Sequence, residues 1–137
     1  MILKVPIGKV GRMEIMDYNI KITDQSNVRY ITSLRNRVWK LLPIYEGRDK
    51  DKKIVMSADK AYDNFYKNLE KLILEVSGAS EIWFENSYYI ELLYLLTGMK
   101  TFLAEDHARI KSIVTHCTDL CEKIKKELLE KIKKEME

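Results

Sequence analysis

Two cysteines and two histidines are the residues of this chain best suited to metal or redox chemistry. Cys117 and Cys121 lie four residues apart, with His116 beside the first and His107 further upstream. Thiolates and imidazoles are ligands that zinc prefers, and an i,i+4 pair on a helix can direct two ligands to one ion. Both cysteines, however, fall in an apolar stripe, where a free cysteine behaves as a small hydrophobic side chain. The spacing therefore predicts core thiols without a metal, and without a disulfide, because side chains one turn apart are poorly placed for a bridge.

Motifs of catalysis or cofactor binding are missing from the sequence. Nucleophilic catalysis needs a Ser, Cys or Thr beside a base that is itself oriented, and the chain has only two histidines. No Gly-x-Ser-x-Gly elbow, no P-loop and no Glu-x-x-His pattern of di-iron bundles occurs. We therefore expect no enzymatic activity, no catalytic or metal-binding residues and no cofactor.

A candidate basic face lies on the first predicted helix and in the loop that follows it. Rows of Arg and Lys neutralise phosphates, and an Asn between them can contact a base or a phosphate. Against this, the loop cations alternate with acidic residues, and no aromatic residue interleaves with the cations as in single-strand binders. A solvated helix face, a nucleic-acid surface and a surface for an acidic protein all remain open. The residues are Arg29, Asn36, Arg37, Lys40, Arg48, Lys52 and Lys53.

A segment near residue 90 is rich in aromatic and aliphatic side chains. Between Tyr88 and Leu96 the only residue without an aromatic or aliphatic body is Glu91. A helix that is apolar nearly all round either lies at the centre of a bundle or faces two partners. Tyr and Trp bring large contact areas at low side-chain entropy, as protein interfaces favour. The sequence therefore predicts a candidate interface of Trp83, Tyr88, Tyr89, Leu92, Tyr94 and Leu96.

Hydrophobic periodicity predicts the helices that carry these residues. A first amphipathic helix is expected from Asp24 or Ser26 to about Leu42, because Pro43 disfavours helical geometry at the residue before it. The charged segment 44–56 should then form an exposed, mobile loop.

Three further helices are expected after this loop. Ser57 should cap the second helix, which Gly78 ends, and Asn86 or Ser87 should cap the third, which ends at Gly98. The last and longest helix should run from Thr101 to about Lys134. We expect its last two turns to project from the bundle or to pack on another chain.

The N-terminal residues 1–22 are predicted to be extended. Apolar side chains alternate with period two on either side of Gly8 and Gly11, which allows a β-hairpin. Alternatively, residues 1–15 are a translated, disordered leader, and the natural start is Met16.

Length and composition limit the possible architectures and functions. The 137 residues, with 46% hydrophobic side chains, can form one core, and 5 Gly and 2 Pro are too few for a turn-rich β-sandwich. We therefore expect an all-α bundle of three to four helices over residues 23–137. No apolar run could span a bilayer, and two cysteines without a secretory signal favour the cytoplasm.

The expected function is non-enzymatic contact with protein, either as a homo-oligomer or as a small regulator or inhibitor of a larger partner. The alternative is a small nucleic-acid-binding protein that uses the basic face. The small size and the richness in Lys and Ile would suit an accessory protein of a phage or another mobile element.

Overall fold

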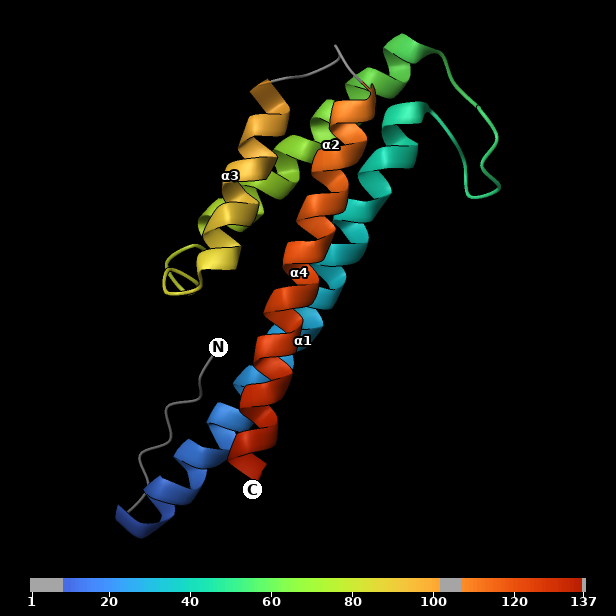
Figure 1. The fold of residues 1–137 in the computed structure, drawn as a ribbon. Coiled ribbons are helices and arrows are strands. Elements are labelled where there is room, and N and C mark those ends of the chain that lie inside the picture. The colour runs from blue at the N-terminus through green and yellow to red at the C-terminus, as the bar shows by residue number, and fades with distance from the viewer. Residues whose placement is uncertain (1–8, 102–106, 137) are drawn as a thin grey trace.

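In the computed structural model the described part of the chain forms four helices that run alternately up and down (Figure 1). The structure describes residues 9–101 and 107–136, with side chains from residue 24 onward. The helices are α1 Lys9–Glu46, α2 Ala58–Gly78, α3 Ser87–Thr101 and α4 His107–Met136. α1 and α3 each pack against both α2 and α4. The predicted all-α bundle is confirmed.

The core lies between the four helices, and each helix contributes residues spaced by three and four. This spacing puts apolar side chains on one face of a helix, and burying each large one stabilises the fold by roughly 1.5–3 kcal/mol. Completely buried members include Ile31, Leu34 and Val38 of α1, Phe65 and Leu69 of α2, Leu92 and Leu96 of α3, and Val114, Cys117 and Cys121 of α4.

The predicted starts of α2 and α3 are confirmed, whereas the predicted end of α3 and the predicted start of α4 are wrong. The Ser57 hydroxyl accepts a hydrogen bond from the Lys60 N–H (3.3 Å), and the Asn86 side chain accepts one from the Tyr89 N–H (3.1 Å). α3 continues through Gly98, and Thr101 is its last residue rather than the start of α4. A glycine within a helix costs only about 1 kcal/mol, so Gly98 alone does not end it.

α1 begins earlier than the sequence suggested, at Lys9. Residues 9–22 are therefore helical where an extended segment was expected. No Gly or Pro occurs between Arg12 and Leu42, so the helix propagates from its amphipathic part at little cost per residue. Residues 1–8 lie outside the described residues, and the leader hypothesis stays a prediction.

α1 also ends later than expected, because it passes through Pro43 and stops at Glu46. The cause of the stop is Gly47, which adopts a left-handed conformation with φ +69°. The Arg48 N–H donates to the Pro43 carbonyl (2.9 Å), and the Gly47 N–H donates to the Ile44 carbonyl (3.0 Å). These two bonds form a Schellman motif, which satisfies the last carbonyls of the helix.

The loop after α1 is exposed, as predicted, and its own hydrogen bonds define its conformation. The Asp49 carboxylate accepts from the N–H groups of Asp51 (2.9 Å) and Lys53 (3.0 Å). Arg48 and Ile54 form an isolated antiparallel bridge. The loop cations are therefore held at this end of the bundle.

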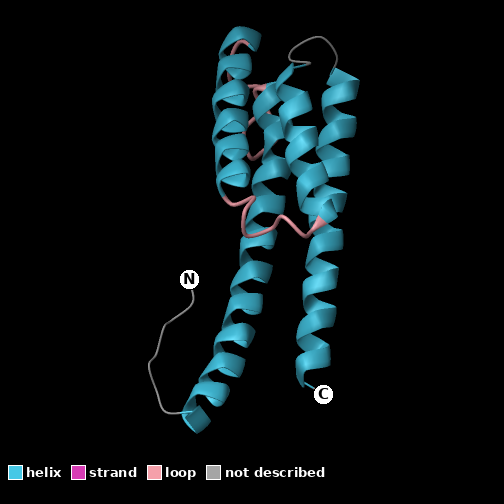
Figure 2. Ribbon diagram, turned by 90° about the vertical axis from the view of Figure 1, so that its left-hand side faces the viewer, coloured by secondary structure: helices cyan, strands magenta, loops and turns pink. Residues whose placement is uncertain are grey.

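α1 and α4 continue past the other two helices as a two-helix projection (Figures 1 and 2). The Asn86 amide donates to the Glu127 carboxylate (3.3 Å), which marks the level of the α2–α3 turn on α4. From Glu127 to Met136, α4 rises by about 14 Å. Lys131 pairs with the buried Asp24 (3.3 Å), so the end of α4 packs on α1 of the same chain.

We predict that Gly47→Ala destabilises the protein by about 1–2 kcal/mol. An L-residue is strained at positive φ, and the new Cβ would meet Met56 Cγ at 3.1 Å and Ala61 Cβ at 3.2 Å. The matched control is Gly98→Ala, whose Cβ meets nothing within 4 Å and which should stabilise α3 slightly. Urea unfolding measures both, and equal free energies of unfolding for the two variants would contradict the prediction.

Candidate functional site

The two cysteines are core residues, as predicted, and both are completely buried. Burial raises the pKa of the Cys117 and Cys121 thiols to about 12, so both stay protonated at neutral pH. The histidines face carboxylates instead. His107 lies 2.8 Å from Glu46, and His116 lies 3.7 Å from Glu91. Within residues 9–101 and 107–136, no cluster of three or more His, Cys, Asp or Glu side chains is placed to hold a metal ion.

Thiol reagents should therefore label Cys117 and Cys121 slowly in the folded protein and rapidly in denaturant, because only the accessible thiolate reacts. Replacing either cysteine by Ala should cost roughly 1 kcal/mol for the small cavity that it leaves. Mass spectrometry after timed alkylation gives the rates. Fast labelling without denaturant would contradict the assignment.

An aromatic cluster joins three parts of the fold at the α2–α3 turn. The rings of Trp83 and Tyr89 stack at 5.1 Å, and the ring of Tyr30 on α1 lies 6.2 Å from that of Trp83. The Tyr89 hydroxyl donates to the Val76 carbonyl (3.1 Å) and lies 3.3 Å from the Tyr30 hydroxyl. Burial raises the pKa of both tyrosines. The cluster fixes the turn against α1 and α2.

This cluster and the core account for most of the predicted interface residues. Tyr89, Leu92 and Leu96 are completely buried within one chain, and Trp83 is 7% exposed. Tyr88 is half-buried beneath Lys123, whose ammonium lies 5.5 Å from the ring centre. Tyr94 alone is open to solvent, with 80% of its surface exposed. Of the six residues, therefore, only Tyr94 is fully available to a partner.

We predict that Tyr89→Phe destabilises the fold by about 1–3 kcal/mol, because the Val76 carbonyl in the last turn of α2 loses its partner. Tyr94→Phe is the matched control and should change the free energy of unfolding by less than about 0.5 kcal/mol. Thermal and urea unfolding measure both. A Tyr89→Phe variant as stable as the Tyr94→Phe variant would show that the buried hydrogen bond contributes nothing.

Four exposed apolar residues lie in the α2–α3 turn and in the first half of α3. We call this surface the apolar corner; its members are Ile82 (76% exposed), Phe84 (67%), Ile90 (41%) and Tyr94 (80%). Residues 72–99, which include this surface, contain four Glu and no Lys or Arg, so the charges of this segment itself are all acidic. Glu81 and Glu85 of the turn have no ion-pair partner among the described residues. The apolar corner is therefore hydrophobic with an acidic rim.

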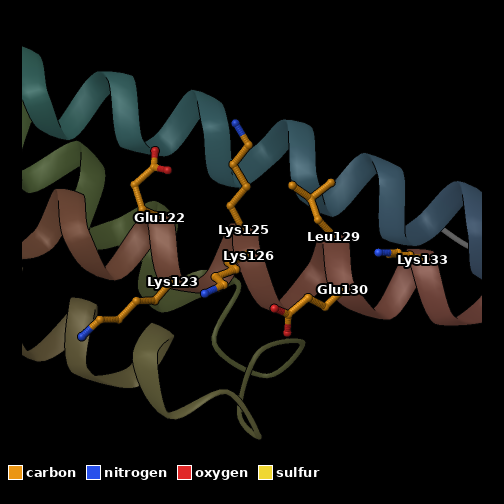
Figure 3. Close-up of a pocket in the computed structure, with 7 residues that line it drawn as sticks. All are labelled: Glu122, Lys123, Lys125, Lys126, Leu129, Glu130 and Lys133. Atoms are coloured by element: carbon orange, nitrogen blue, oxygen red, sulfur yellow. The ribbon is translucent and has the colours of Figure 1, made fainter.

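A shallow groove of the opposite character runs along α4 (Figure 3). Leu129, which is 48% exposed, lies near its middle. Lys126 and Lys133 line the groove and have no ion pair with any residue that the structure describes, whereas Glu122 is paired with Arg35. We call this surface the lysine groove; its lining is Glu122, Lys123, Lys125, Lys126, Leu129, Glu130 and Lys133, and its volume is about 520 Å³.

The predicted basic face is divided by the structure. Arg29, Asn36, Arg37 and Lys40 line one groove of about 490 Å³ on α1, and Lys125 of α4 joins them there. Arg48, Lys52 and Lys53 lie in the loop beyond Glu46, which is about 26 Å further along α1 than Arg29. The loop cations therefore do not join this groove.

Within the groove, the guanidinium of Arg37 is already bound. It makes two hydrogen bonds of 2.7 Å to the Glu75 carboxylate of α2, which raise the pKa of Arg37 and lower that of Glu75. Arg29, Lys40 and Lys125 have no ion pair among the described residues. We call Arg29, Ser33, Asn36, Lys40 and Lys125 the basic stripe.

Several residues of these surfaces were not found by sequence reasoning. Helical periodicity puts Trp39 on the same side of α1 as the buried Ile31, Leu34 and Val38, yet it is 51% exposed. Lys125 joins the basic stripe only through the packing of α4 on α1. One feature of the sequence does indicate these charged surfaces. Residues 25–45 contain no acidic residue and residues 72–99 contain no basic one, so charge is segregated along the chain.

Comparison with protein families, with curated proteins and with solved structures finds no match to this chain. In the part of the chain that the structure describes, no helix has both the length and the apolarity needed to cross a membrane.

Proposed function

We propose that this protein is a non-enzymatic helical protein that acts by protein–protein contact, and that its partner is a second copy of the same chain. In the proposed dimer the apolar corner of each copy packs on the lysine groove of the other. A homodimer held together by two equivalent contacts is the commonest form of closed assembly.

The observation that carries the proposal is the complementarity of these two surfaces. Each has exposed apolar side chains at its centre, with Phe84 in the corner and Leu129 in the groove. The rim of the corner carries Glu81 and Glu85, whereas Lys126 and Lys133 line the groove. Pairing the two would bury apolar area and match opposite charges, which gives an interface both affinity and register.

The shape of the molecule supports a reciprocal pairing. The corner is a step at which two helices end and the α1–α4 pair continues (Figure 2). Two such stepped molecules, turned head to tail about a two-fold axis, would each place a corner beside the projection of the other. Apolar surface left open on a soluble monomer commonly marks such a contact.

The first test is the molar mass of the protein, measured by light scattering over a range of concentrations. We expect a dimer, and we expect Phe84→Ser to dissociate it while each copy stays folded, because Phe84 lies outside the core. Val55→Ser is the matched control, since Val55 is 55% exposed in the α1–α2 loop at the other end of the bundle. A parent protein that stays monomeric at every concentration would refute self-association.

A charge exchange tests the pairing of surfaces. Glu81→Lys with Glu85→Lys should yield a monomer, because the corner would then face lysines of the other copy. Adding Lys126→Glu with Lys133→Glu in the same chain should restore the dimer. Failure of the second pair to restore it, with the helical circular dichroism unchanged, would mean that the groove is not the partner surface.

A contact with a different protein is the second candidate, and the same surface would serve it. The exposed Tyr94 of α3 favours neither partner over the other. We further propose a cytoplasmic location, in keeping with two free, buried thiols.

A further inference from the structure

The outer side of α1 carries a long surface that is free of acidic residues. No Asp or Glu occurs in residues 25–45, although the whole chain has 21 of them. Arg29, Ser33, Asn36 and Lys40 recur at helical spacing along this side and line one groove. From Arg29 to Lys40 the row is about 16 Å long, and every member can donate a hydrogen bond.

Acidic residues that reach this surface from neighbouring helices are already paired. Glu75 of α2 is bound to Arg37 through two hydrogen bonds, and Glu122 of α4 is paired with Arg35. Lys125 of α4 points toward α1 (Figure 3). The three free cations, Arg29, Lys40 and Lys125, therefore face solvent without a neutralising carboxylate among the described residues.

An aromatic ring stands beside this row. Trp39 is 51% exposed, directly precedes Lys40 and lies three residues after Asn36. The other tryptophan, Trp83, is buried and stacked on Tyr89. Large aromatic rings in the core are expected, whereas a half-exposed indole beside unpaired cations offers a flat surface on which a base can stack.

We propose that the basic stripe and Trp39 form a binding site for single-stranded nucleic acid. Arg29, Lys40 and Lys125 contact phosphates, Asn36 and Ser33 donate hydrogen bonds to the backbone or to bases, and one base stacks on Trp39. The stacking ring distinguishes this ligand from an acidic protein segment, which would need the cations alone. This site shares Lys125 with the lysine groove, whereas Arg29, Lys40 and Trp39 lie outside the surfaces proposed for self-association.

The experiment is a fluorescence titration of the full chain with a 12-nucleotide deoxythymidine oligomer. Stacking on Trp39 should quench the tryptophan emission. Since three cations are involved, log K should fall with log salt with a slope of about −2, which is a loss of roughly 20-fold between 50 and 200 mM salt. Poly-glutamate of similar charge serves as the competing acidic polymer.

Substitutions separate the contribution of the cations from that of the Trp39 ring. The triple change of Arg29, Lys40 and Lys125 to Gln should abolish both binding and its salt dependence. The matched control changes Lys60, Lys67 and Lys111 to Gln, which alters the net charge equally at exposed positions outside the stripe and should bind as the parent does. Trp39→Ala and Trp39→Tyr lack the reporting indole, so their affinity is measured by mobility shift. Trp39→Ala should weaken binding of the oligomer by about 5- to 150-fold, and Trp39→Tyr should keep part of the binding.

Oligomer binding that is lost in the stripe variant and kept in the control would support the site. No quenching and no mobility shift at 50 mM salt would overturn it. Equal affinity for poly-glutamate, unchanged in Trp39→Ala, would also overturn it and would assign the stripe to an acidic protein instead. Lys125 lines both the basic stripe and the lysine groove, so a variant with only Arg29→Gln and Lys40→Gln is titrated as well. This variant leaves the groove intact and should still lose most of the strand binding. Light scattering on the same samples shows whether the dimer is kept, which keeps the two outcomes separate.

Discussion

The hydrogen bond from the Tyr89 hydroxyl to the Val76 carbonyl (3.1 Å) holds the α2–α3 turn in place. α2 ends two residues after Val76, and a carbonyl in the last turn of a helix has no partner within that helix. Tyr89 supplies the partner, and its ring stacks on Trp83, which in turn lies 6.2 Å from the Tyr30 ring. One side chain thus joins the end of α2, the turn and α1. With the turn fixed in this way, Ile82 and Phe84 on either side of Trp83 are left on the outside.

The position of this turn also gives the molecule its two levels. Above the turn four helices enclose the core, and below it α1 and α4 pack only against each other (Figure 1). Ion pairs join α4 to α1 of the same chain on both sides of this level, between Arg35 and Glu122 above the turn and between Asp24 and Lys131 below it. Two helices cannot enclose a core as four can, which explains why Leu129 is half-exposed in this region. The step and the projection are consequences of unequal helix lengths.

The sequence predicted the helices better than their ends and their surroundings. Periodicity identified the core faces. Ser57 was correctly predicted as an N-cap, and of the two candidates Asn86 and Ser87 it is Asn86 that caps α3. The prediction that Pro43 ends the first helix was wrong. A proline removes only one hydrogen bond from the helix, and the helix ends instead where Gly47 adopts a left-handed conformation. Burial of Tyr89 and exposure of Trp39 were missed for a different reason. A helical wheel gives the direction of a side chain, but not whether a neighbouring helix is long enough or close enough to cover it.

Segregation of charge along the chain connects the two surfaces. The acid-free residues 25–45 and the cation-free residues 72–99 leave the molecule with a basic side and an acidic corner, although its net charge is only +3. If the acidic corner is covered by the lysine groove of a second copy, Arg29 and Lys40 of each copy stay uncompensated. A dimer would then present two stripes, and one nucleic-acid strand long enough to reach both would bind more tightly than to either alone, since the second contact is intramolecular. Self-association would in that case strengthen strand binding without any new contact to the strand.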